Sequence, residues 1–357
     1  MATIQDVARL ANVSVSSVSN VLNGRAERMR RDTFVRIEQA IEKLGYRPNQ
    51  IARHLKTGHI PILGLLVPTT SNPSFGQLAV AIEQVAQSRH NYRVLVCNTY
   101  RDKQLEAKML DDLIGLGIRA VIVISSLNDE RHIEAAIAKG LAVVSYDLGI
   151  DPAKPARHDH VLPDNRLAGR LAANHLIAYG HKRLAFVKPK GATISRREKI
   201  EGFLGAVDEA GKGYSAQIID IDGGSRFGDN ELAQLGFEAA QQISAMTPRP
   251  TGIVAVNDMT AIGVMAGLRH CGLSIPEDVS VVGMDNVSVS EYVWPPLTTV
   301  ATPVQEVAET MVEQAIARVH EPATPPREFS FPPHLVERQS VSEPGKPFQP
   351  NAALQKS

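Results

Sequence analysis

The chain has 357 residues, 43% of them hydrophobic, and a formal net charge of zero at pH 7. This length allows about two or three domains with buried cores. The first residues lack the apolar core of a signal peptide, and no run of about 18 apolar residues occurs, so we expect a cytoplasmic protein with no membrane segment. Cys97 and Cys271 lie outside metal-binding spacings and are expected to be buried, which argues against a disulfide framework or a zinc site.

The charge is unevenly distributed along the chain. Residues 1–60 carry ten basic and five acidic side chains, a net charge of +5, so the remainder carries −5. A basic segment attached to an acidic body is compatible with nucleic-acid binding, although charged runs are most often solvated surfaces.

The first residues predict two short helices joined by a turn. Thr3 is a candidate N-cap, Asp6 stands three residues later in a capping-box position, and apolar residues follow at helical spacing. After a break, Ser14 is expected to cap a second helix, and Val18 and Leu22 belong to its apolar face. The small polar side chains of this helix point elsewhere and allow it to approach a polar surface closely.

A third helix is expected from about Asp32 to Leu44, ending before Gly45. Phe34 and Ile37 are among the residues expected to close a three-helix core. Two helices joined by a tight turn are typical of a helix-turn-helix, whose second helix enters the major groove of DNA. The alternative interpretation is a surface helical hairpin.

Two stretches at a fixed distance resemble the LacI/GalR family of bacterial transcription regulators. They are TIQDVARLANVSVSSVSNVLNG (residues 3–24) and LGYRPNQIARHLKTG (residues 44–58), and the resemblance continues to LVERQS (residues 335–340). It implies a helix-turn-helix DNA-binding domain over residues 1–48, followed by a hinge helix and linker over residues 49–60.

The resemblance also assigns residues to the operator. Val15, Ser16 and Asn20 stand at base-reading positions, and Leu55 matches a leucine that is wedged into the minor groove. Such a wedge unstacks a base step at a cost of about a few kcal/mol, which is offset by bending the DNA toward further contacts. The alternative for Leu55 is a core leucine. The remaining DNA-binding candidates are Thr3, Ser14, Ser17, Ser19, Asn23 and Ala52.

From residue 62 onward, β-branched apolar runs alternate with helical segments. Near-continuous apolar strands separated by helices predict parallel sheets covered on both faces. Eight such runs occupy residues 62–68, 93–99, 120–126, 142–148, 183–189, 216–222, 252–258 and 279–285.

A pause at residues 151–169 divides these runs into two groups, which predicts two doubly wound parallel-sheet lobes. The fold class is therefore a small all-α helix-turn-helix domain plus α/β lobes, and the resemblance makes these lobes periplasmic-binding-protein-like. The expected effector-binding and dimerisation domain covers residues 61–342. One lobe takes about 61–161 with 292–323, and the other takes about 162–291 with 324–342. Residues 343–357 are expected to be disordered.

Ligands of such sheets bind at the carboxyl ends of the strands, here between the lobes. Acids, amides and hydroxyls near the ring of Phe75 suit a polyhydroxylated ligand. Each residue taken alone is equally interpretable as a helix cap or a loop acid. The residues selected by this rule are Thr69, Asn72, Phe75, Asp147, Lys190, Ser195, Asn257, Asp258 and Asp285.

The resemblance narrows this set. Lys199 stands where the family usually has arginine, and a lysine lacks the planar fork of a guanidinium. Because further basic residues lie at 188–197, the effector is expected to be a sugar or an acidic sugar, with a purine as the alternative. The expected effector site comprises Asn72, Phe75, Asp147, Ser195, Lys199, Asn257 and Asp285.

Two other pairs are interpreted as structural. Asp164 and Asn165 are expected to cap a helix where the chain crosses between the lobes. His158 and His160 are expected to be loop histidines, because no third metal ligand is indicated. No metal and no cofactor are therefore expected.

Three classes of function compete. An enzyme of the doubly wound type would need a phosphate loop or a nucleophile, but GxGxxG after a strand, GxxxxGK[ST] and GxSxG are all absent. A transported-sugar receptor would need an export signal. A regulator explains both halves of the chain, with no catalytic residue. We expect a homodimer on a pseudo-palindromic double-stranded operator, since the tail lacks a leucine heptad for tetramerisation.

Overall fold

The computed structural model describes residues 2–22, 24–26, 29–46, 60–125, 127, 129–148, 156–223 and 231–345. The chain divides into two compact units, Met1–Ile60 and Pro61–Ser357. The predicted hinge helix lies outside the described residues, and so do Asn23, Ala52, Leu55 and the tail beyond residue 345.

The first unit contains the three predicted helices, α1 (Ile4–Ala11), α2 (Val15–Leu22) and α3 (Arg31–Leu44). The predicted capping box is confirmed: the Thr3 amide donates to the Asp6 carboxylate at 3.0 Å, and the Asp6 amide donates to Thr3 Oγ1 at 3.3 Å. The Ser17 amide donates to Ser14 Oγ at 3.2 Å, as expected of an N-cap. At the end of α3, Gly45 adopts a left-handed conformation with φ 55°.

Small apolar side chains from all three helices form the core of this unit. Its fully buried members are Val7, Ala8, Ala11, Val18, Ile37 and Ala40. Phe34, which the sequence placed in this core, is instead half-buried and lies outside the cluster.

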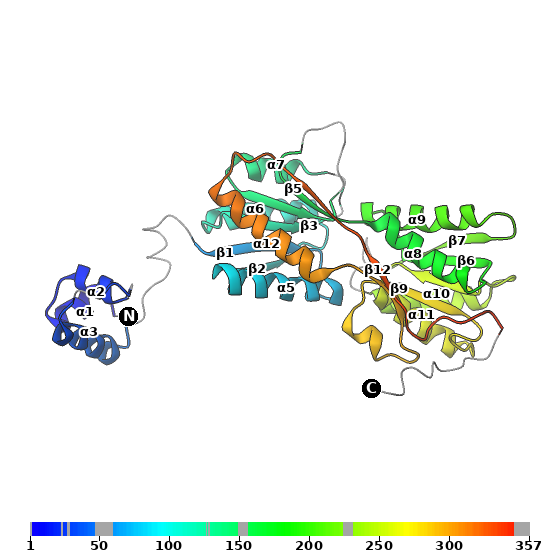
Figure 1. Cartoon of the computed structure of the whole chain (residues 1–357), viewed down its shortest axis with the longest axis horizontal. Helices are drawn as coiled ribbons and strands as arrows, with labels where there is room; N and C mark the ends of the chain where they lie inside the picture. The colour runs from blue at the N-terminus through cyan, green and yellow to red at the C-terminus, as the bar shows by residue number, and fades with distance from the viewer. Residues whose placement is uncertain are drawn as a thin grey trace. The chain divides into compact units, whose positions relative to one another are not determined.

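The second unit holds two six-stranded sheets, each covered by helices on both faces (Figure 1). The first sheet has the order β11-β5-β4-β3-β1-β2, and all its strands are parallel. Its strands are β1 (Ile62–Val67), β2 (Arg93–Asn98), β3 (Ala120–Ile124), β4 (Ala142–Tyr146), β5 (Asp159–Pro163) and β11 (Glu328–Phe331). One face packs against α5 (Pro73–His90) and α12 (Val304–His320), and the other against α6 (Lys103–Gly115) and α7 (Arg131–Ala138).

The second sheet has the order β12-β10-β9-β8-β6-β7, with β12 antiparallel to β10. Its strands are β6 (Arg183–Pro189), β7 (Ser215–Ile221), β8 (Gly252–Ala255), β9 (Ser280–Met284), β10 (Thr298–Ala301) and β12 (His334–Val336). Helices α8 (Asn165–Ala178) and α9 (Ile194–Ala210) cover one face, and α10 (Leu232–Ser244) and α11 (Asp258–His270) cover the other. A short 3-10 helix spans Ser288–Glu291. The fold class predicted from the sequence is confirmed.

Helices α8 and α9 pack unusually closely through glycine. A Cβ atom on Gly169 of α8 would lie 1.9 Å from the Lys199 carbonyl oxygen of α9, and one on Gly202 would lie 1.9 Å from the Arg166 carbonyl oxygen. Only glycine fits at these two positions. The close contact fixes the position of α9, which carries Lys199, relative to α8.

The predicted division of the lobes is wrong in two places. β10, at residues 298–301, belongs to the second sheet, although residues 292–323 were assigned to the first lobe. β11, at residues 328–331, belongs to the first sheet, although residues 324–342 were assigned to the second lobe. The chain therefore crosses between the lobes three times, after β5, β10 and β11.

Three other expectations need correction. The sequence analysis missed β5, and His160, which was expected in a loop, is buried within this strand. His158 lies in a bend directly before β5, as expected of a loop residue, and is also buried. Cys271 is exposed and Cys97 only partly buried, whereas both were expected to be buried. In the described part of the chain, no helix is both long enough and apolar enough to cross a membrane.

Candidate DNA-binding helix and candidate effector cleft

Helix α2 has one face in the core of the first unit and one face in solvent. Val18 is fully buried, whereas Val15 is 43% exposed, and Ser16 and Asn20 are exposed as well. Ser14 Oγ lies 2.7 Å from Ser16 Oγ. The exposed face therefore carries one valine among short hydrogen-bonding side chains, which suits contact with a thymine methyl group and base edges.

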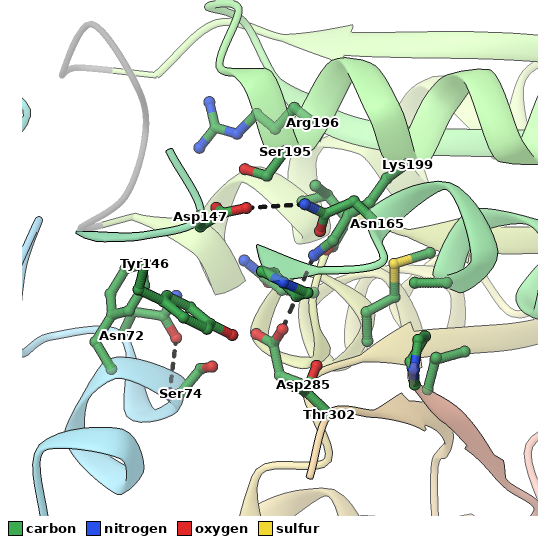
Figure 2. Close-up of a pocket in the computed structure, with 18 of the residues that line it drawn as sticks. Asn72, Ser74, Tyr146, Asp147, Asn165, Ser195, Arg196, Lys199, Asp285 and Thr302 are labelled. Carbon is green, nitrogen blue, oxygen red and sulfur yellow. Dashed lines mark hydrogen bonds and ion pairs between the residues drawn. The ribbon is translucent and has the colours of Figure 1, made fainter. Parts of the chain in front are cut away.

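The second unit holds a cavity between its lobes, at the carboxyl ends of the strands (Figure 2). Its volume is about 100 Å³. All three crossings border it, through Asp164, Thr302 and Pro333. The structure places on this one cavity all seven residues of the expected effector site: Asn72, Phe75, Asp147, Ser195, Lys199, Asn257 and Asp285.

The first lobe contributes the start of α5 to the cavity. Asn72 is the N-cap of this helix, and its Oδ1 accepts from the Ser74 amide at 3.1 Å. Phe75 lies one turn into the helix, where its ring packs against the apolar core of the first lobe and also lines the cavity. On the opposite side, Asn257 caps α11 and accepts from the Thr260 amide at 2.9 Å.

A polar link spans the first crossing. Asn165 Nδ2 donates to Asp147 Oδ1 at 2.8 Å and lies 3.3 Å from Glu198 Oε2 (Figure 2). Burial raises the pKa of Glu198, although the hydrogen bond from Asn165 opposes this. Asp164, the neighbouring residue, caps α8 as predicted, since its Oδ1 accepts from the Leu167 amide at 2.8 Å. Asn165 itself is therefore a residue of the cleft rather than the cap.

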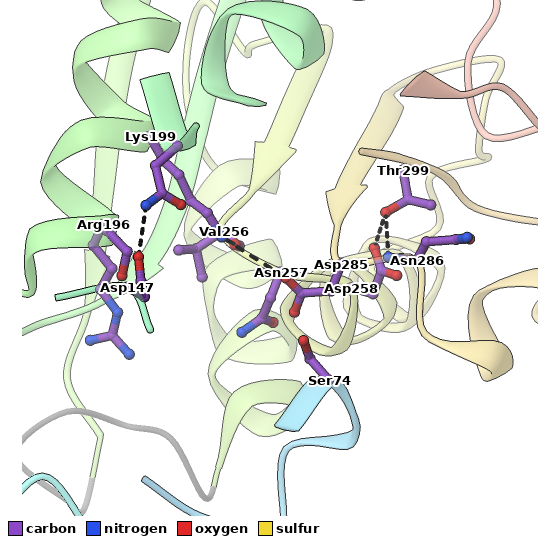
Figure 3. Close-up of polar contacts among 12 residues, drawn as sticks. Ser74, Asp147, Arg196, Lys199, Val256, Asn257, Asp258, Asp285, Asn286 and Thr299 are labelled. Atoms are coloured by element: carbon purple, nitrogen blue, oxygen red, sulfur yellow. Dashed lines mark hydrogen bonds and ion pairs between the residues drawn. The ribbon is translucent and has the colours of Figure 1, made fainter. Parts of the chain in front are cut away.

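Lys199 and Asp285 form the charged pair of the second lobe (Figure 3). Lys199 Nζ lies 3.9 Å from Asp285 Oδ1 and donates to the Val256 carbonyl oxygen at 3.2 Å. Burial raises the pKa of Asp285 to about 6, while Lys199 and a hydrogen bond from Ser74 act to lower it. Burial likewise raises the pKa of Tyr146 far above its ordinary value.

Both carboxylates stand on strained backbone. Asp147 has φ 60° and Asp285 has φ 112°, values that residues other than glycine rarely adopt. Such strain persists only where the surrounding structure enforces it, and it is concentrated at functional sites. Its occurrence at two facing acids of one cavity supports a binding role for that cavity.

Three residues selected by the strand-end rule do not line the cavity. Lys190 is exposed and pairs with Asp222, and Thr69 is buried at the start of the first loop. Asp258 is fully buried behind Asp285, where it accepts from the Val287 amide at 2.8 Å and from Thr299 Oγ1 at 2.5 Å. Burial and the charge of Asp285 raise the pKa of Asp258 to about 8.

The cleft also contains residues that sequence reasoning missed. Arg101 follows β2 and lines the cavity, with only 8% of its surface exposed. The strand-end rule would have found it, because residues 93–99 were predicted as a strand. Arg196, one of the basic residues at 188–197, is 5% exposed and also lines the cavity.

Charges of both signs are balanced around the cavity. Its basic lining residues in the described chain are Arg101, Arg196 and Lys199, and its acidic ones are Asp147, Asp164 and Asp285. Among the described residues, no group of three His, Cys, Asp or Glu side chains is arranged to hold a metal ion. Carboxylates, amides and hydroxyls with paired charges are suited to a polar, uncharged ligand that carries many hydrogen-bonding groups.

Comparisons with known proteins connect the two units to one class of protein. Residues 3–49 match the family model described as bacterial regulatory proteins, lacI family, and residues 173–341 match the periplasmic binding protein-like domain. A helix-turn-helix unit joined to a two-lobe body of this kind defines a DNA-binding transcription regulator with an effector-binding domain.

Full-length relatives identify the family. The chain is 32% identical over 345 residues to the HTH-type transcriptional repressor PurR of Aliivibrio fischeri, with 96% of this chain and 99% of the relative covered. A LacI family transcriptional regulator from Enterococcus faecalis, solved with bound ribose, is 31% identical with a TM-score of 0.69, covering 79% of this chain and 99% of that one. The lac repressor dimer bound to operator has a TM-score of 0.81 at 23% identity, with coverage of 96% and 99%, and shares the fold. The chain belongs to the LacI family.

Proposed function

We propose that this protein is a repressor that binds a pseudo-palindromic operator as a homodimer and is controlled by a small carbohydrate in the interlobe cleft. The observation that carries the proposal is the presence, in one chain, of an exposed polar helix α2 and a charge-balanced cleft. The full-length relatives are named repressors, which supports repression rather than activation of transcription. No catalytic role is part of the proposal, and its place of action is the cytoplasm, where bacterial DNA lies.

In this proposal, Val15, Ser16 and Asn20 read bases. The neighbouring hydroxyls Ser14, Ser17 and Ser19 contact phosphates, as do Thr3 and Asn23. In the proposed hinge at residues 49–60, Leu55 enters the minor groove, where an apolar wedge bends the operator, and Ala52 leaves room for the hinge helices of the two subunits to approach each other. The proposed DNA-binding domain is residues 1–48, and residues 61–342 bind the effector and dimerise.

Exposed aromatic side chains on the second lobe support self-association. Tyr292 is 81% exposed and Trp294 is 71% exposed, and large aromatic rings are uncommon on the surface of a monomer. A two-fold dimer presents two copies of α2 to two half-sites about one helical turn apart. An effector that changes the angle between the two lobes then changes the distance between the two α2 helices, each of which reads one half-site.

For the effector, we propose a neutral sugar as the first candidate. Asp147, Asn257 and Asp285 offer acceptors and donors for hydroxyls, and the related Enterococcus faecalis regulator was solved with ribose. A purine is the second candidate, favoured by the rings of Phe75 and Tyr146 at the cavity.

A thermal unfolding screen of the full chain tests the proposal. The panel contains D-ribose, D-ribonate, cellobiose and hypoxanthine. A ligand at 100 times its Kd adds about 2.7 kcal/mol of stability, or roughly 5 to 10 °C in Tm for a unit of this size. Electrophoretic mobility shift with the ligand then shows whether it releases DNA. If the sugars give no shift and hypoxanthine does, the carbohydrate proposal fails and the purine takes its place.

A further inference from the structure

The first lobe contains a second cavity, at the opposite edge of its sheet from the effector cleft. It has a volume of about 300 Å³ and shares no lining residue with the cleft. Arg119, Ala142 and His158 line it at the amino ends of β3, β4 and β5, and Arg318 lines it from the last turn of α12. Cavities of roughly 150 Å³ hold a benzene molecule, so this one has room for a small organic molecule.

His158 lies in the wall of this cavity, but its ring nitrogens are buried and are not open to it. Its side chain is 2% exposed, and neither Nδ1 nor Nε2 has a hydrogen-bond partner among the described residues. By contrast, His160, whose ring centroid lies 4.2 Å away, has Nδ1 at 3.1 Å from Ser145 Oγ. Burial, with the charges of His160 and Arg318, lowers the pKa of His158 to about 3, so its ring is neutral and keeps one N–H donor. Because its nitrogens are not accessible from the cavity, His158 shapes the wall and offers no hydrogen bond to a ligand.

The rim of the cavity carries positive charge. Arg119 and Arg157 are exposed lining residues, and neither forms an ion pair within the described part of the chain. Arg318 differs, because its guanidinium binds the buried Asp159 carboxylate at 2.6 and 2.9 Å. The ends of α7 and α12 add only about half a negative charge each, less than the charge of the two guanidinium groups.

The remaining wall is apolar and is formed by Ile137, Leu141, Val143, Val319 and Pro322. An apolar wall beside two guanidinium groups matches a molecule with an apolar body and an anionic head. We propose that this cavity is a second ligand site, which takes a small organic anion whose carboxylate or phosphate accepts hydrogen bonds from Arg119 and Arg157.

Calorimetric titration of the full chain tests this site with four probes. Benzoate and phenyl phosphate carry both head and body, inorganic phosphate carries the head alone, and benzyl alcohol carries the body alone. We expect at least one of the two aromatic anions to bind with one site per chain and at least tenfold more tightly than inorganic phosphate or benzyl alcohol. Which anion binds better distinguishes a carboxylate ligand from a phosphate ligand.

Variants locate the site. The double variant Arg119→Gln and Arg157→Gln changes only exposed side chains and should weaken the better anion at least tenfold. Arg93→Gln is the matched control, since Arg93 is an exposed arginine at the same edge of the same sheet that does not line the cavity, and it should bind as the unchanged chain does. Lys199→Met, in the effector cleft, should also leave anion binding unchanged.

The proposal is overturned if neither aromatic anion binds at millimolar concentration, if Arg93→Gln weakens binding as much as the double variant, or if Lys199→Met abolishes it.

Discussion

Lys199 Nζ and Asp285 Oδ1 lie 3.9 Å apart at the edge of the effector cleft, with side chains only 15% and 18% exposed. The positive charge of Lys199 is therefore largely compensated within the protein. An anionic ligand that approaches Lys199 also approaches the Asp285 carboxylate. This relationship favours a neutral sugar over the acidic sugar that the isolated basic stretch suggested.

D-ribose should accordingly bind at least as tightly as D-ribonate in the same calorimetric assay. Lys199→Met should weaken D-ribose by about tenfold, because it leaves Asp285 buried without its counter-charge, a loss of about 1.5 kcal/mol or more. Arg197→Met, which changes an exposed cation on α9, is the control and should leave the affinity unchanged. Tighter binding of D-ribonate, lost in Lys199→Met, would instead establish an acidic effector.

Asp258 should make the protein less stable as the pH rises above 7. Its pKa in the folded chain is about 8, against an ordinary value of 3.8. Between these values the folded state holds a proton that the unfolded state has released, so the free energy of unfolding falls as pH rises toward 8. The histidines whose pKa burial lowers, such as His158 and His181, act in the opposite direction, because at pH 7 the unfolded state still holds part of a proton on each of them. The contribution of Asp258 is therefore measured against a variant that lacks only this carboxyl.

We expect the free energy of unfolding in urea to fall from pH 7 to pH 8 by about 1 kcal/mol more in the unchanged chain than in Asp258→Asn. The amide of this variant does not titrate, and its oxygen can accept from the Val287 amide while its Nδ2 donates to Thr299 Oγ1. Asp208→Asn, at an exposed position late in α9, should retain the fall. An unchanged pH slope in Asp258→Asn would show that this carboxyl does not carry the titration.

The elements that the sequence analysis predicted correctly are those whose signals lie close together in the chain. Caps such as Thr3 and Ser14 depend on residues three positions away. The eight apolar runs form strands as predicted, because a continuous apolar run signals a buried strand without reference to any distant residue. The cleft residues followed, because the ends of correctly predicted parallel strands meet at one edge. Asp147 and Asp285 were found in this way.

The remaining features depend on distant partners. β5 begins with the polar residues Asp159 and His160, and its burial relies on Arg318, 159 positions further along the chain. β10 and β11 are four-residue strands whose sheet is decided by the crossings and not by their own pattern. Asn165 follows a true cap, and only the fold shows that its amide reaches Asp147.

Gly169→Ala should destabilise the second lobe. The new Cβ would stand 1.9 Å from the Lys199 carbonyl oxygen, so α8 and α9 must separate, at a cost of about 2 to 3 kcal/mol. Gly205→Ala in α9 is the matched control, because its Cβ meets only the Arg170 guanidinium at 3.7 Å. There the better helix propensity of alanine should stabilise the chain by roughly 0.5 to 1 kcal/mol. Urea denaturation distinguishes the two, and equal effects would contradict the close packing.

Leu55→Ala should lower affinity for the specific operator far more than affinity for random DNA. Leu55 lies outside the described residues, and its role comes from the resemblance of residues 44–58 to the family's hinge. A wedge acts only where the DNA is bent, so its loss spares nonspecific binding, which depends on phosphate contacts. Fluorescence anisotropy with both duplexes measures the ratio, and equal losses on both would remove Leu55 from the minor groove.

Replacing Val15, Ser16 and Asn20 together should change the operator that the protein selects. These side chains are exposed on α2, so the exchange leaves the apolar core around Val18 intact. Each base contact contributes about 1 to 3 kcal/mol of discrimination, and selection from random duplexes should therefore return a different half-site. Thr3→Ala serves as the comparison, because losing the N-cap lowers the stability of the unit by about 1 kcal/mol without touching base-reading residues. It should weaken binding while returning the original sequence. If the triple variant also returned that sequence, α2 would not be the helix that reads the operator.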